Sequence, residues 1–161
     1  MSSYENGDFN TKYGTITVRN PGRVAPPPNL QTYKRRGVKG IVQAGGLTDV
    51  TLQGPALRAF KEAERRANPR KYRKQDRLLP ILITGVGYRS YALQKSLYEN
   101  SDQPGRYANP DGSLHCEALA IDVHSGQSLA RRARIKFCLM REGFHYAVPG
   151  ESWHASFNRR G

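Results

Sequence analysis

Apolar residues recur at helical spacing in three parts of the chain. The first helix is predicted over 55–67. Asn68-Pro69 would end it, because the residue before a proline avoids helical backbone angles. The other two helices are predicted over about 90–98 and over 129–141. The first 50 residues lack this helical spacing of apolar residues.

Shorter stretches alternate apolar and polar residues, which is typical of β-strands. The clearest is 118–124, where Leu119, Ile121 and Val123 alternate with small or polar side chains. Shorter runs of the same kind predict further strands at 13–18, 81–84, 145–148 and 153–157. These strands and the three helices predict an α+β fold, with a small antiparallel sheet and flanking helices.

The N-terminal region is rich in proline and glycine, including Pro26-Pro27-Pro28. We therefore divide the chain into a basic arm or linker over 1–51 and a single catalytic domain over 52–161. The pattern leaves three roles open for the first 50 residues: an arm that binds a partner, a strap across the domain, or a disordered segment.

Composition narrows the class of protein. The chain has 161 residues, enough for one domain with a core of its own. No apolar run is long enough for a transmembrane helix, and the polar start of the chain predicts no secretory signal peptide. Two cysteines are too few for a disulfide framework or a four-cysteine zinc site.

The net charge of +13 comes from 26 Lys and Arg against 13 Asp and Glu. So positive a chain is expected to meet a polyanion, which can be nucleic acid, an acidic membrane or an anionic cell-wall polymer. Basic residues concentrate in 51–77. A solvated helix face would look the same, so the charge alone does not select a partner.

Four polar residues in the C-terminal half are candidates for catalysis. His115 ends a loop, Asp122 lies on the predicted strand that follows, and His154 lies on the last predicted strand. Two imidazoles and a carboxylate suit Zn²⁺ and leave a coordination position for water. Glu151, three residues before His154, is a candidate general base. A capping role for Asp122 and a buried structural role for His115 are the alternatives.

Two motifs resemble the signatures of the D-alanyl-D-alanine carboxypeptidase and dipeptidase family of zinc peptidases, which also includes the L-alanyl-D-glutamate endopeptidases of phage lysins. They are Ser113-x-His115-x-x-Ala118-x-Ala120-x-Asp122 and Glu151-Ser152-Trp153-His154. The segment 84–90, which ends in Gly-Tyr-Arg-Ser, matches a third family block. The resemblance covers 79–157. One departure is Ala118, which stands where the family has a glycine and would strain the backbone if that position has a positive φ.

The resemblance implies one Zn²⁺ per chain, held by the two histidines and the aspartate, with Glu151 as the general base. It implies that Arg89 is catalytic and binds the oxyanion or a substrate carboxylate, and that Gln94 and Ser113 bind or position the substrate. Trp153 is expected to pack beneath the site. Cys116, next to a ligand, is expected to pack rather than to bind metal.

The resemblance implies a peptidase that hydrolyses the stem peptides of peptidoglycan. A short, basic chain without a signal peptide favours an L-alanyl-D-glutamate endopeptidase of the phage endolysin type, made in the host cytoplasm and released to the wall, or carried on the virion. The alternative enzyme is a D-alanyl-D-alanine carboxypeptidase. A non-enzymatic protein that binds the wall or nucleic acid is the rival from another class, although no nucleic-acid motif is visible. We expect a monomer whose partners are peptidoglycan and anionic wall polymers.

Overall fold

The computed structural model describes residues 6–19, 25–34, 49–67, 87–103, 105–123, 129–146 and 150–157. Within these ranges the α-helices are α1 (Gly54–Ala67), α3 (Tyr91–Asn100) and α4 (Leu129–Arg141), and a short 3₁₀ helix, η1, spans Pro110–Gly112. Helix and strand are mixed along the chain, so the predicted α+β class is confirmed. None of the helices in the described ranges has the length and apolar composition needed to cross a membrane.

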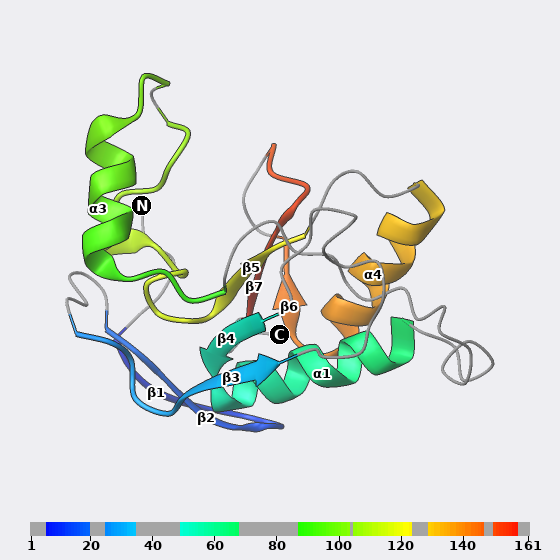
Figure 1. The fold of residues 1–161 in the computed structure, drawn as a ribbon. Helices are drawn as coiled ribbons and strands as arrows, with labels where there is room; N and C mark the ends of the chain where they lie inside the picture. The colour runs from blue at the N-terminus through cyan, green and yellow to red at the C-terminus, as the bar shows by residue number, and fades with distance from the viewer. Residues whose placement is uncertain are drawn as a thin grey trace.

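The strands of the described residues form three small antiparallel sheets (Figure 1). The first is the hairpin β1–β2, and the second pairs β3 with β4. The third has the order β5–β7–β6. The strand bounds are Gly7–Thr11 for β1, Gly14–Val18 for β2, Leu30–Lys34 for β3, Asp49–Gln53 for β4, Ala120–Asp122 for β5, Phe144–His145 for β6 and His154–Phe157 for β7.

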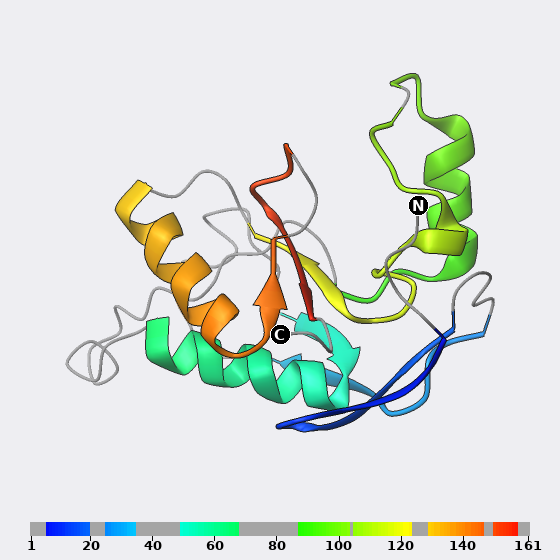
Figure 2. The same ribbon diagram turned by 180° about the vertical axis from the view of Figure 1, so that it is seen from behind.

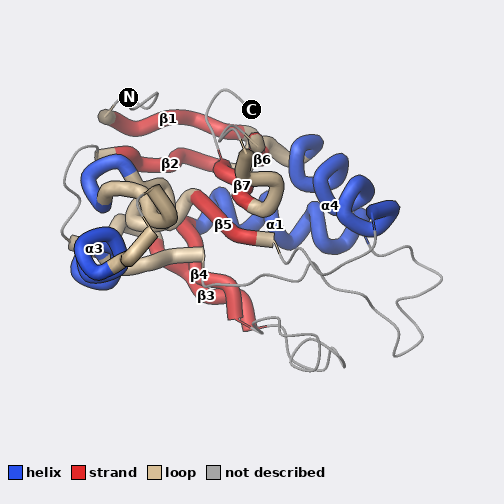
Figure 3. Tube along the Cα trace, turned by 90° about the horizontal axis from the view of Figure 1, so that it is seen from above, coloured by secondary structure: helices blue, strands red, loops and turns tan. Residues whose placement is uncertain are grey.

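Helix α1 lies at the centre of the packing. It contacts β2, β3, β4 and α4. Figure 1 shows the three-stranded sheet above the two N-terminal sheets, and Figure 3 shows α3, which contacts η1, at the end of the molecule opposite α4. The buried face of α1 carries Leu57, Phe60 and Ala63, as the periodicity predicts.

One apolar core joins the N-terminal strands to the rest of the chain. Buried residues from nearly every element belong to it, among them Ile16, Val18, Val50, Leu52, Phe60, Ile121, Leu139 and Phe157. Apart from a strand at 13–18, little regular structure was expected before residue 50. This expectation is wrong for β1 and β3, because their mostly polar sequences show no clear alternation of apolar and polar residues. The division after residue 51 stays a prediction, and these contacts favour a strap across the domain over a free arm.

The strands predicted at 13–18 and 153–157 are present as β2 and β7, each beginning one residue later than predicted. The strand predicted at 145–148 is wrong where it is described, because β6 is limited to Phe144–His145 and residue 146 is not part of it. Helix α4 has the predicted bounds, α1 begins one residue earlier than predicted, and α3 begins after its N-cap Ser90. The strand predicted at 118–124 is shorter than expected, with β5 limited to Ala120–Asp122. The strand predicted at 81–84 lies outside the described residues.

A buried glutamine ties the N-terminal hairpin to the loop that precedes β5. Gln53 is 1% exposed, and its Nε2 donates to the carbonyls of Thr17 (2.8 Å) and Glu117 (2.7 Å). Its Oε1 accepts from the backbone N–H of Thr17 at 3.0 Å. The backbone N–H of Gln53 also donates to Ala118 O at 3.0 Å. One side chain thus makes three hydrogen bonds to the backbone of two different segments.

We expect Gln53→Ala to lower the free energy of unfolding by about 2–4 kcal/mol, because it removes these three hydrogen bonds, of which the one to Glu117 O is buried. Urea unfolding followed by circular dichroism measures the change. The matched control is Gln31→Ala on the exposed side of β3, with an expected change within about 0.5 kcal/mol. Equal effects of the two substitutions would contradict the structural role of Gln53.

Candidate metal centre

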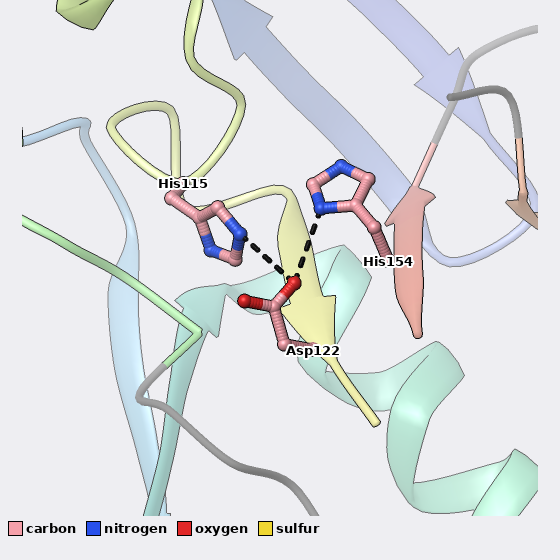
Figure 4. A group of neighbouring side chains, drawn as sticks. All are labelled: His115, Asp122 and His154. Carbon is pink, nitrogen blue, oxygen red and sulfur yellow. Dashed lines mark hydrogen bonds and ion pairs between the residues drawn. The ribbon is translucent and has the colours of Figure 1, made fainter. Parts of the chain in front are cut away.

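The three predicted ligands meet at one point (Figure 4). Asp122 ends β5 and His154 begins β7, and the register of the two strands places them directly opposite each other. His115 comes from the loop before β5. Asp122 Oδ1 lies 3.3 Å from His115 Nε2 and 3.2 Å from His154 Nδ1. One ligand atom of each residue lies within 4.8 Å of the others, so the predicted group is brought together.

The loop that carries His115 is held by a tight backbone turn. The N–H of Ala118 donates to His115 O at 3.1 Å, and the N–H of Leu119 donates to Leu114 O at 3.0 Å. Ala118 has a φ of 56°, in the left-handed region that favours glycine. This is the position where the resembling family has glycine. Alanine adopts this conformation at a cost of about 1 kcal/mol.

The orientation of His115 determines which of its nitrogens can bind a metal. Its Nδ1 lies 3.0 Å from the carbonyl oxygen of Gly87, and a carbonyl only accepts, so Nδ1 carries a proton and donates. In the neutral ring, Nε2 then presents a lone pair to a carboxylate oxygen of Asp122, which is also an acceptor. This contact is favourable only if the ring takes a second proton or if a cation lies between the two atoms.

Gly87 reaches His115 because it has no side chain. A Cβ at this position would lie 2.7 Å from both Thr51 O and Leu52 Cδ2. The next N–H, of Tyr88, donates to Thr51 O at 2.7 Å, which holds the segment against β4. Sequence analysis included Gly87 in a motif but assigned it no role, because this contact spans 28 residues of sequence.

His154 is fixed in a similar way by a residue that sequence analysis missed. Its Nε2 lies 3.0 Å from Ser156 Oγ, and Ser156 is 1% exposed. If Nε2 donates to this hydroxyl, Nδ1 keeps its lone pair toward Asp122. Residues two apart in a strand share a face, so the spacing of His154 and Ser156 was a usable signal. Such outer partners orient metal-binding histidines in many proteins.

Asp122 is held in its charged form. Burial alone would raise the pKa of this carboxyl, but the hydrogen bonds and charges of His115 and His154 hold it well below its usual range. Once the two rings give up the protons that face Asp122, the charged carboxylate and two imidazole nitrogens form the donor set that suits Zn²⁺, with a position left for water. The residues present therefore fit the expected zinc ion.

Arg89 and Gln94 are also brought together. Arg89 Nη1 donates to Gln94 Oε1 at 2.8 Å, and Gln94 Nε2 donates to the carbonyl of Ala108 at 2.7 Å. Gln94 is 1% exposed, and both ends of its amide are occupied, so it positions the guanidinium. The backbone N–H of Arg89 donates to His115 O, which joins this pair to the histidine loop. Ser113 is also buried, and its Oγ has no hydrogen-bond partner among the described residues.

The remaining candidates lie outside the three-residue group. Glu151 is half-buried on the turn before β7, and its carbonyl accepts from the N–H of His154 at 3.4 Å. Trp153 is exposed, so the expectation that it packs beneath the site is wrong. Its backbone contributes instead, because its carbonyl accepts from Val123 N at 2.7 Å. Cys116 is buried, which raises the pKa of its thiol, and it is not part of the group.

No protein-family model matches this chain, and no curated protein sequence does. Solved structures that this chain resembles include DacB from Streptococcus pneumoniae D39, at 20% identity and a TM-score of 0.47, covering 98% of this chain and 85% of that one. The structure of the LdcB LD-carboxypeptidase, which concerns peptidoglycan recognition, matches at 20% identity and a TM-score of 0.45, covering 98% and 84%. At this identity and these TM-scores, the functional evidence for this chain lies in the residues of the site.

We expect His154→Ala to abolish metal binding, because it removes one of three protein ligands. Zinc content after dialysis, measured by atomic emission, should fall from about one ion per chain to the background level. The control is His145→Ala, which removes a histidine of the same sheet that is outside the group and should keep the zinc. Full zinc content in the His154 variant would show that the ligand assignment is wrong.

Proposed function

We propose that this chain is a zinc-dependent peptidase that hydrolyses the stem peptides of peptidoglycan. The observation that carries the proposal is the meeting of His115 Nε2, Asp122 Oδ1 and His154 Nδ1, with the other nitrogen of each ring hydrogen-bonded to an oxygen. The order and spacing of these residues agree with the family motifs found in the sequence.

His115, Asp122 and His154 would hold the metal ion. A bound zinc ion lowers the pKa of water toward neutrality and polarises a carbonyl group. Glu151 is proposed to take the proton of the attacking water and to pass it to the leaving amine. The turn at 150–153 places Glu151 next to the start of β7, three residues before the ligand His154.

Arg89 is proposed to bind negative charge on the substrate. Its planar guanidinium can donate two parallel hydrogen bonds to a carboxylate, or it can stabilise the developing oxyanion. Gln94 holds one edge of the guanidinium, so less side-chain entropy is lost when the substrate binds. Gln94 and the buried Ser113 act in this proposal as residues that shape the site, with Ser113 at the C-cap of η1 before the His115 loop.

Within this class we favour an L-alanyl-D-glutamate endopeptidase of the phage endolysin type over a D-alanyl-D-alanine carboxypeptidase. The net charge of +13 suits an enzyme that works on a solid, anionic wall. Both kinds of substrate carry carboxylates, so Arg89 is compatible with either. A protein that binds the wall without cutting it is the non-enzymatic alternative, and the intact set of four candidate residues argues against it.

The products of digestion distinguish these possibilities. We expect the zinc-loaded protein to cut purified peptidoglycan so that D-glutamate, or its amidated form, becomes a new N-terminal residue of the stem peptides. Mass spectrometry of the products identifies this terminus. Released D-alanine would instead identify the carboxypeptidase. Intact peptidoglycan after incubation with fully zinc-loaded protein would overturn the proposed enzyme and favour a binding protein.

We expect Glu151→Gln to keep its zinc and to lose at least about a hundredfold in turnover, because the amide cannot accept the proton of water. Initial rates of peptidoglycan solubilisation and zinc content are the two measurements. Glu99→Gln, on the exposed face of α3, is the matched control and should keep full activity. Unchanged turnover in the Glu151 variant would remove this residue from the mechanism.

A further inference from the structure

Seven cationic side chains gather on elements that do not carry the metal centre. They line two adjoining hollows of about 290 and 510 Å³, which share Arg65 and Arg66. Helix α1 contributes four of them: Arg58, Lys61, Arg65 and Arg66. The turn between β1 and β2 adds Lys12, and α4 adds Arg134 and Arg141. We call this surface the basic groove; α1 lies between α4 and the β1–β2 hairpin (Figure 2).

The basic groove carries an excess of positive charge that its own acids do not balance. Among the described residues, two carboxylates line the hollows, those of Glu62 and Glu142. Glu142 is 2% exposed, and it contacts Lys12 Nζ at 3.0 Å and Arg66 Nε at 3.1 Å. Glu62 pairs with Arg65 and Arg66. Seven cations against two carboxylates leave an excess of five, and their mutual repulsion would be relieved by a bound anion.

Several of these cations are already fixed in position. Arg58 Nε donates to the carbonyl of Tyr13 at 3.1 Å. Arg134 donates to the last carbonyls of α1, through Nε to Ala67 O and through Nη2 to Arg66 O, both at 3.0 Å. A guanidinium has five N–H donors, so both arginines keep donors for a ligand. Because the groups are held in place, binding costs less side-chain entropy.

We propose that the basic groove binds a flexible polymer of phosphodiesters. Guanidinium groups match the geometry of phosphate oxygens, which accept two parallel hydrogen bonds. The cations come from three elements, and Glu62 and Glu142 lie among them, so an occupant must place its charges on the cations and avoid the carboxylates. A flexible chain with separated phosphates can do this. The fixed phosphate rows of a duplex and the flat surface of a membrane adjust less readily to such an arrangement.

The source of this polymer is a phosphodiester chain attached to the bacterial wall, of the poly(glycerol phosphate) type. This choice of source rests on the proposed function, since a peptidase that digests a solid wall gains from a second attachment to it. Tethering by the basic groove would raise the effective concentration of stem peptides at the metal centre without any new contact there. The binding chemistry of the groove does not depend on hydrolysis.

The test measures binding of poly(glycerol phosphate) to the full chain by titration calorimetry at about 50 mM and 200 mM salt. The variant is Lys61→Gln with Arg141→Gln, which removes one cation from each hollow. We expect binding to weaken about tenfold or more. The slope of log K against log salt should become less steep by about 1–2, because fewer counterions are released. The matched control is Lys95→Gln with Arg106→Gln, two exposed cations elsewhere, which should stay within about twofold.

Hydrolysis of a soluble stem peptide separates this proposal from the proposed function. Both double variants should cleave it at the rate of the unaltered chain, because neither touches the metal centre. Polymer binding without any hydrolysis would support the groove and count against the peptidase. Equal weakening by the two double variants would overturn the groove in favour of diffuse attraction. Groove-dependent binding of duplex DNA or anionic vesicles without binding of the polymer would overturn the proposed occupant.

Discussion

The candidate site depends on the register between β5 and β7. Asp122 faces His154 across the sheet, and Ala120 faces Ser156 on the same side. The two candidate ligands and the hydroxyl of Ser156 therefore project from the same face of the sheet. The opposite side pairs Ile121 with Ala155, and both are fully buried. A slip of one residue would send the polar groups into the core and the apolar ones to the site. Burial of one face therefore fixes the geometry of polar atoms on the other.

A second constraint acts on the imidazole rings. His115 and His154 each have one nitrogen occupied by an oxygen of the protein, Gly87 O in the first case and Ser156 Oγ in the second. Rings held in this way need little rearrangement when an ion arrives, which favours both affinity and a defined geometry. The candidate metal ligands are thus oriented by residues outside their own group.

Sequence alone gave a useful but uneven account of the molecule. The helices over 55–67 and 129–141 were predictable because their apolar residues repeat with the helical period. The order of the motifs indicated the three candidate ligands, and the structure brings these residues together. The contacts of Gln53 with Glu117 and of His115 with Gly87 were not, because they join residues 64 and 28 positions apart. Local periodicity carries no information on such distant pairs. The pairing of β3 with β4 could not be predicted for the same reason.

The shared core of the N-terminal strands restricts how this chain can change through evolution. Ile16 and Val18 pack with Phe60 inside the molecule, so β1 and β2 are not an appended module that recombination can replace freely. Substitution is least constrained on the outer surface of the hairpin, where Asp8 and Thr17 form an exposed hydrogen bond. Diversity among descendants of this protein should therefore accumulate on that surface, while the inward side chains of the same strands stay apolar.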